Sequence, residues 1–191
     1  CRGRDKIEVF REKVSKYRTE LTKEQQIALA QHLHDDEFVP ALLANVQYLK
    51  EMPGTSDTFS YLKNKGVFVA TGSGFPQVVT DAINERLGWK EKGLVDYGTC
   101  GAAAGGGRPK PNMINAALIA AGRLPGGVDK SQKQDFDYEI ILKVGDTVDD
   151  IHEGQKVGAT TIAVVSGTQS LETLLKENPK VVLPSIAAVP S

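Results

Sequence analysis

The sequence is poor in cysteine and in aromatic residues, and it contains no long hydrophobic run. Two cysteines among 191 residues cannot build a disulfide framework, which predicts a reducing compartment. The longest apolar stretches, such as 116–121 and 162–165, are far shorter than the roughly 18 residues that a membrane-spanning helix needs. We therefore expect a cytoplasmic protein that does not associate with membranes.

The sequence also lacks an excess of charge of either sign. Lysine and arginine number 23 and aspartate and glutamate 24, which gives a net charge of −1. Dedicated nucleic-acid binders usually carry a strongly basic surface, so this class is not expected. Residues 1–24 hold eight basic and five acidic side chains, a modest bias that is typical of a solvated helix face.

Residues 1–52 have the periodicity of helices and no convincing strand. Thr22 followed by Gln25 fits a capping box, which predicts that a second helix begins there, and a third helix is expected over 40–51. The break at 52–55, with its proline and glycine, ends this unit. The first helix is predicted by apolar residues at steps of three and four, namely Ile7, Phe10, Val14, Tyr17 and Leu21.

Residues 53–191 alternate between strand and helix patterns. Such alternation predicts an α/β fold, in which a parallel sheet is covered by helices on both faces. A polar, glycine-rich loop is expected over 123–137. The expected strands cover 66–70, 94–99, 139–144, 160–165 and 181–183, and the expected helices cover 76–88, 111–122, 150–157 and 171–177.

The loop that follows the first expected strand reads Thr71-Gly72-Ser73-Gly74 and leads into a helix at Pro76. Ligands of open α/β sheets bind at the carboxyl ends of the strands. A hydroxyl and flexible backbone before a helix N-terminus form a good cradle for an anionic oxygen, such as that of a phosphate. The alternative is an ordinary helix cap, because serine and threonine are preferred there.

A second loop combines a glycine run with two cations, Arg108 and Lys110, just before the helix that Pro111 opens. Either cation could clamp a phosphoryl group and neutralise the charge that shifts during its transfer. The alternative is a mobile loop with solvated charges.

A third loop places three carboxylates, Asp146, Asp149 and Asp150, after a strand. Like charges this close repel each other unless a cation is present, and Mg²⁺ suits one or two carboxylates with several waters. The alternative is that Asp149 or Asp150 caps the following helix. Cys100 is expected to be a small buried residue.

In this order, the three loops resemble the motifs of the haloacid dehalogenase superfamily, and in particular its phosphonatase branch, the phosphonoacetaldehyde hydrolases and their relatives. The matching strings are VATGSGF at 69–75, GRPKPNM at 107–113 and VGDTVDDI at 144–151. The resemblance covers nearly the whole chain. It implies a Rossmann-like parallel-sheet core over 53–191 and a small all-helical cap over 1–52, which excludes water and selects the substrate.

The resemblance implies a Mg²⁺-dependent hydrolase of a small phosphorylated or phosphonate metabolite. Thr71, with Gly72 and Ser73, would bind the phosphoryl oxygens, and Arg108 would be the motif's cation, with Lys110 in reserve. Asp146 would ligate Mg²⁺, and Asp150 would hold it directly or through water. Members of this branch often form homodimers through the cap, so a homodimer is expected.

The family's nucleophile is an aspartate at the end of a strand ahead of the cap, where it forms an aspartyl-phosphate. The 191 residues contain no such motif ahead of the helical unit. We expect this aspartate to lie outside the chain, on a strand in the middle of the sheet. A catalytically inactive binding protein is the alternative.

A further match concerns the sequence GRDKIE at 3–8, which resembles a segment of the phosphonatase cap. In phosphonoacetaldehyde hydrolase the lysine of this segment forms a Schiff base with the aldehyde. The resemblance therefore makes Lys6 the candidate for cleavage of a phosphorus–carbon bond. The alternative is a solvated lysine on an amphipathic helix.

Overall fold

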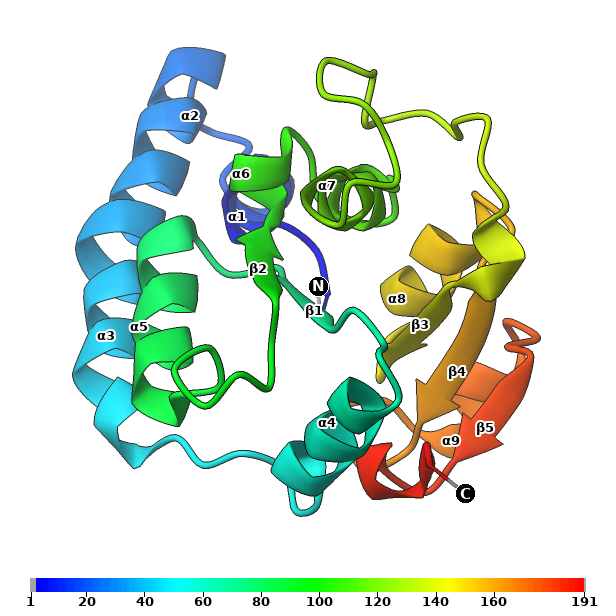
Figure 1. The fold of residues 1–191 in the computed structure, drawn as a ribbon. Coiled ribbons are helices and arrows are strands. Elements are labelled where there is room, and N and C mark those ends of the chain that lie inside the picture. The colour runs from blue at the N-terminus through cyan, green and yellow to red at the C-terminus, as the bar shows by residue number, and fades with distance from the viewer. Residues whose placement is uncertain (1–2, 191) are drawn as a thin grey trace.

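The computed structural model describes residues 3–190 (Figure 1). Its first part is helical, as predicted, and the capping box of Thr22 and Gln25 is present. The expected third helix is not separate, because α2 continues through a π-helical segment into α3. The elements are α1 (Lys6–Tyr17), α2 (Lys23–His32), π-helical η1 (Leu33–Phe38), α3 (Val39–Asn45) and 3₁₀ η2 (Val46–Tyr48).

The rest of the chain alternates between helices and short parallel strands, which confirms the predicted α/β class. Figure 1 shows α5 between α3 and β2, and α3 contacts α5. The elements are α4 (Thr55–Asn64), β1 (Ala70–Ser73), α5 (Gln77–Leu87), β2 (Tyr97–Cys100), α6 (Gly101–Ala104), α7 (Asn112–Ala120), η3 (Tyr138–Ile140), β3 (Leu142–Gly145), α8 (Val148–Gln155), β4 (Thr160–Val164), α9 (Leu171–Leu175), β5 (Val181–Leu183) and η4 (Ile186–Ala188).

The strands form two parallel sheets rather than the expected single one. One sheet has the order β1-β2, with Thr71 opposite Gly98, and the other has the order β3-β4-β5, with Gly145 opposite Ala163. Within residues 3–190, β1 and β3 each pair on one edge only. Their other edges face a shared cavity, described below.

The first strand begins later than predicted. It starts at Ala70 and not at residue 66, and Val67 and Phe68 are 41% and 40% exposed. These two residues have the apolar character of a buried strand, but they lie ahead of β1 and line the cavity between the sheets. The helix α4 was not predicted, and neither was the short α6. Cys100 is fully buried, as expected.

The loop at 123–137 is tied to α7 by a buried polar network. The Tyr138 hydroxyl donates to Asn115 Oδ1 at 2.6 Å and accepts from the Gln134 amide at 3.1 Å. The Asn115 amide donates to the carbonyls of Lys130 and Gln132 at 3.0 and 2.8 Å. This network holds α7, whose N-terminus follows the Arg108 loop.

The link between the helical unit and the α/β part is fixed to the core by Glu51. Its Oε2 accepts hydrogen bonds from the Trp89 indole at 2.8 Å and from the Ser56 hydroxyl at 2.6 Å. The next turn uses Gly54 with φ +80°, and a Cβ there would lie 2.6 Å from the Ala187 side chain. No helix of the described residues is long and apolar enough to cross a membrane.

We expect Tyr138→Phe to lower the free energy of unfolding by about 1–3 kcal/mol, because it leaves the buried Asn115 Oδ1 without its donor. Urea denaturation of the protein and the variant measures the change. Tyr17→Phe makes the same chemical change on a side chain that is 66% exposed and is expected to have little effect. Equal losses in the two variants would contradict this role for the network.

Candidate active site

A cavity of about 990 Å³ lies between the two sheets; it runs along the unpaired edges of β1 and β3 and reaches their carboxyl ends. Segments that are far apart in the sequence meet there. The core supplies the loop after β1, the Arg108 loop and the acidic loop after β3, and the helical unit supplies α1 and Phe38. The predicted site residues that line the cavity are Lys6, Thr71, Gly72, Ser73, Arg108, Asp146 and Asp150.

The loop after β1 is shaped by close backbone contacts. Ser73 Oγ accepts a hydrogen bond from the Phe75 amide at 3.0 Å, which turns the chain toward α5. A Cβ on Gly74 would lie 2.5 Å from the carbonyl oxygen of Arg4, so this position has no room for a side chain. The loop therefore packs closely against the backbone just before α1, and this contact explains the glycine at position 74.

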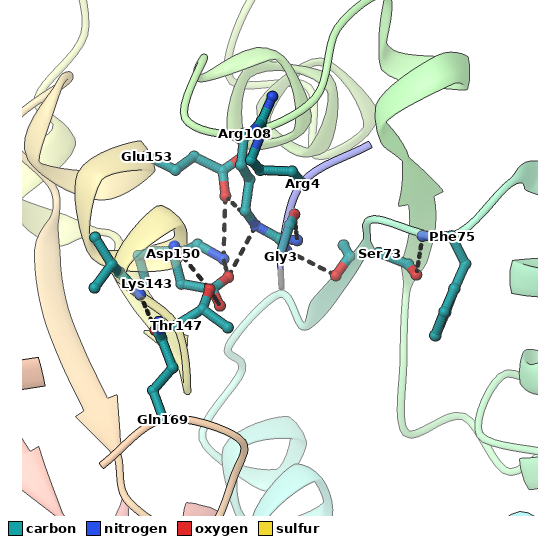
Figure 2. Close-up of polar contacts among 12 residues, drawn as sticks. Gly3, Arg4, Ser73, Phe75, Arg108, Lys143, Thr147, Asp150, Glu153 and Gln169 are labelled. Carbon is teal, nitrogen blue, oxygen red and sulfur yellow. Dashed lines mark hydrogen bonds and ion pairs between the residues drawn. The ribbon is translucent and has the colours of Figure 1, made fainter. Parts of the chain in front are cut away.

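Four buried charged side chains form an ion quartet, defined as Arg108, Lys143, Asp150 and Glu153. Asp150 Oδ1 lies 2.8 Å from both Arg108 Nε and Lys143 Nζ. Glu153 Oε2 lies 2.9 Å from Arg108 Nε and 3.1 Å from Lys143 Nζ. Figure 2 shows the four side chains meeting beside α8. Two positive and two negative charges compensate each other, as buried charges must.

The quartet keeps Asp150 ionised. Burial alone would raise the pKa of Asp150, but the charges of Lys143 and Arg108 and the hydrogen bonds from Lys143 and Thr147 lower that pKa to about 2. A Cβ on Gly145 would lie 2.3 Å from Asp150 Cβ, so the absence of a side chain at Gly145 allows α8 to approach β3 this closely.

Arg108 also connects the quartet to two backbone segments. Its Nη2 donates to the carbonyl of Gly72 at 2.8 Å, and its Nη1 donates to the carbonyl of Gly3 at 3.1 Å. The other predicted cation, Lys110, is exposed and lies outside the cavity lining. Lys143 lines the cavity instead and was not predicted as a site residue. Its position two residues before Gly145-Asp146, near the end of a strand, could have indicated that it lies at the site.

In the acidic loop, the cap of α8 is Thr147 and not an aspartate, so the alternative that Asp149 or Asp150 caps this helix is wrong. Thr147 Oγ1 accepts from the Asp150 amide at 3.2 Å and donates to Asp150 Oδ2 at 2.6 Å. Asp146 comes before the cap. Its Oδ2 accepts from the amide and the hydroxyl of Thr168 at 2.7 and 2.8 Å, which orients the carboxylate.

The donor set fits a magnesium ion that takes one carboxylate from this chain. No group of three histidine, cysteine, aspartate or glutamate side chains in residues 3–190 is arranged to hold a metal alone. Mg²⁺ needs no such group, because it is usually bound by one or two carboxylates, waters and substrate phosphate oxygens. Both hydrogen bonds to Asp146 engage Oδ2, whereas both oxygens of Asp150 are engaged by the quartet and Thr147.

Lys6 lies half-buried on α1 at the cavity, near the aromatic ring of Phe75. Its Nζ donates to the Arg4 carbonyl at 2.9 Å and lies 5.3 Å from the centre of the Phe75 ring. Burial has the largest effect on the pKa of Lys6 and lowers it, and the positive charge of Arg108 lowers it further. The lysine is therefore more readily deprotonated than one on an open helix face.

Several hydrolases are similar to this chain in sequence. A family model described as HAD-hydrolase-like matches residues 106–189. Phosphonoacetaldehyde hydrolase from Pseudomonas entomophila is 29% identical over 137 residues, which are 71% of this chain and 45% of that protein. The same enzyme from Pseudomonas putida is 32% identical over 120 residues, or 63% and 39%. The chain thus spans about half the length, or less, of these two relatives.

Solved structures share the fold. The crystal structure of a phosphonoacetaldehyde hydrolase-like protein from Oleispira antarctica superposes with a TM-score of 0.72 at 19% identity. The match covers 98% of this chain and 74% of that one. At this level of identity the likeness establishes a common architecture.

We expect Asp150→Asn to lower the free energy of unfolding at neutral pH by about 3–5 kcal/mol, because it leaves Arg108 and Lys143 with uncompensated buried charge. The native stability that depends on ionised Asp150 is fully present above its ordinary pKa of 3.8 and is lost as the pH falls toward 2. The variant should lack this part of the pH dependence. Denaturant unfolding between pH 2 and pH 7 measures both effects.

Asp149→Asn is the matched control, since it removes a neighbouring carboxylate that is outside the quartet. It is expected to change stability by less than about 0.5 kcal/mol. Equal losses for the two variants would show that the quartet does not stabilise the fold.

Proposed function

We propose that the protein is a Mg²⁺-dependent hydrolase of the haloacid dehalogenase superfamily that acts on a small phosphorylated or phosphonate metabolite. The family match over residues 106–189 and the similarity to phosphonoacetaldehyde hydrolases support this proposal. The observation that carries this proposal is the convergence of Thr71, Arg108 and Asp146 on one cavity. A hydroxyl and a carboxylate at the carboxyl ends of β1 and β3, together with a cation on the loop before α7, are groups that phosphoryl transfer requires.

Each group would have a distinct role. The Thr71 hydroxyl and the loop backbone would bind the phosphoryl oxygens. Arg108 and Lys143 would supply positive charge beside the phosphoryl group, in orientations set by the quartet. Asp146 would bind Mg²⁺, which when bound neutralises the charge of the transferred group. Asp150 would act by fixing Lys143 and Arg108.

The nucleophile would come from a strand that fills the slot between β1 and β3. Each of these strands is the edge of a parallel sheet, and neither edge has a partner within residues 3–190. Phe68, just before β1, and Leu142, in β3, are 40% and 52% exposed. Unpaired strand edges with apolar flanks favour the addition of another strand. An aspartate at the carboxyl end of that strand would lie beside Thr71 and Asp146. It would attack phosphorus in line and displace the organic group, forming an aspartyl-phosphate that water then hydrolyses to the free aspartate and inorganic phosphate.

The helical unit would act as the cap. Residues 6 to 48 cover the cavity from the side of α1, and Lys6, Val9, Phe10 and Phe38 line it. A cap of this kind excludes water and selects the substrate. We also propose that the protein works in the cytoplasm as a homodimer that assembles through these helices.

We expect Asp146→Asn in the complete protein to reduce Mg²⁺-dependent release of phosphate by more than about 100-fold, because the metal loses its carboxylate. Phosphate release from a panel of small phosphate esters and phosphonates measures this. Asp149→Asn, which leaves the metal ligand in place, is the control. Undiminished turnover in Asp146→Asn would refute the assigned role. Ligand binding by the unaltered protein without any turnover would favour an inactive binding protein.

A second candidate is phosphonoacetaldehyde hydrolase itself, because burial lowers the pKa of Lys6 at the cavity. A neutral Lys6 amine would add to the aldehyde carbon and expel water, giving an imine. The protonated imine would accept the electron pair of the phosphorus–carbon bond as the phosphoryl group passes to the aspartate. The enamine that results would take up a proton, and water would then release the aldehyde product and free Lys6.

For this candidate we expect borohydride, added with the aldehyde, to convert the imine to a stable secondary amine on Lys6. Peptide mass spectrometry locates the label. Lys6→Arg should abolish the labelling while keeping the positive charge. Labelling at another lysine, or none, would reject this candidate and leave the broader proposal standing.

A further inference from the structure

The walls of the cavity differ in polarity. At the carboxyl ends of β1 and β3 the core supplies a hydroxyl, cations and carboxylates, and along the two strands it supplies apolar side chains such as Phe68 and Leu142. The helical unit supplies Val9, Phe10 and Phe38, and Lys6 is the only polar side chain that it adds among the described residues. Phe75, which follows the Thr71 loop, adds another aromatic ring opposite α1.

The aromatic rings of the helical unit form a braced cluster, defined as Phe10, His34 and Phe38. The rings of Phe10 and Phe38 meet edge to face with centroids 5.4 Å apart. His34 packs behind them, at 5.9 Å from Phe10 and 6.2 Å from Phe38, and it is buried. Its Nδ1 is held by Asp35 at 2.6 Å. This packing limits how far the two phenylalanines can move to admit a polar group.

Val9 and Phe10 lie three and four residues after Lys6, about one turn farther along α1, and all three side chains line the cavity. Lys6 is near Phe75 and the phosphoryl-binding loop, and Phe10 lies farther along the helix. A substrate held by its phosphoryl group would therefore place its organic part against Val9, Phe10 and Phe38. A hydroxyl in that place would lose its water, and the described lining of the helical unit offers it no polar side chain besides Lys6, which is unfavourable.

We propose that Phe10 and Phe38 are specificity-determining residues that select an organic part without hydroxyl groups. This inference rests on the proposed function. The substrates are short phosphonates or phosphate esters with an apolar or carbonyl-bearing chain, and phosphorylated sugars and other polyols are rejected. Lys6 uses one of its three donors on the Arg4 carbonyl and has no acceptor, so it cannot accept the hydrogen bonds that the hydroxyls of a polyol donate.

The test compares two non-hydrolysable ligands of equal length, propylphosphonate and 2,3-dihydroxypropylphosphonate, by isothermal titration calorimetry of the complete protein with Mg²⁺. We expect propylphosphonate to bind about 10- to 100-fold tighter, the range in which an apolar pocket rejects an added hydroxyl. Phe38→Tyr adds a hydroxyl to the wall and should reduce this ratio severalfold. Phe38→Leu keeps the wall apolar and should preserve the ratio even if both affinities fall.

Equal affinities, tighter binding of the dihydroxy ligand, or the same ratio in Phe38→Tyr as in the unaltered protein would overturn the proposal. Turnover assays separate it from the proposed function. If propylphosphonate binds selectively but propyl phosphate is not hydrolysed, the proposed hydrolase function is rejected and the selectivity stands. If propyl phosphate and glycerol 3-phosphate are hydrolysed equally well, the selectivity is rejected and the hydrolase function stands. If neither phosphonate nor inorganic phosphate binds, the phosphoryl site itself is wrong.

Discussion

Arg108 is the residue through which the parts of the site are held in one arrangement. Its guanidinium contacts two carboxylates of α8, the carbonyl beside Thr71, and the carbonyl of Gly3 ahead of α1. A buried arginine requires such partners, because its charge cannot be removed at any ordinary pH. The orientation of α8, the loop after β1 and the start of α1 are therefore coupled through one side chain.

The same constraint explains why residues of opposite charge are concentrated at the end of β3. Lys143 shares both carboxylates with Arg108, so the quartet is neutral although each member is charged. Glu153 is 1% exposed, and its Oε1 has no hydrogen-bond partner in residues 3–190. Burial of Oε1 without a partner costs the carboxylate its hydration. The pairing of Oε2 with two cations compensates for this loss and thereby stabilises the folded protein.

Much of the fold followed from local patterns. The capping box at Thr22, the helix from Pro76 to Gly88 and the strand at 181–183 depend on residues close in sequence, and the structure contains all three. The start of β1 was misplaced because an apolar run indicates burial without showing which edge has a partner. The quartet was missed because Arg108 and Glu153 are 45 residues apart, and charges on helices are usually solvated. The loops that line the cavity were found because strand ends meet at one edge of a sheet.

The contact between Glu51 and Trp89 has a consequence for observing the molecule. Trp89 is the single tryptophan of the chain. Its indole donates a hydrogen bond to Glu51, which lies on the segment that joins the helical unit to the α/β part. Its ring also stacks edge to face on Phe59 of α4, with centroids 5.3 Å apart. A rotation of the helical unit that pulled Glu51 away would change the polarity around this one chromophore. The protein thus carries its own fluorescent reporter at the joint between its two parts.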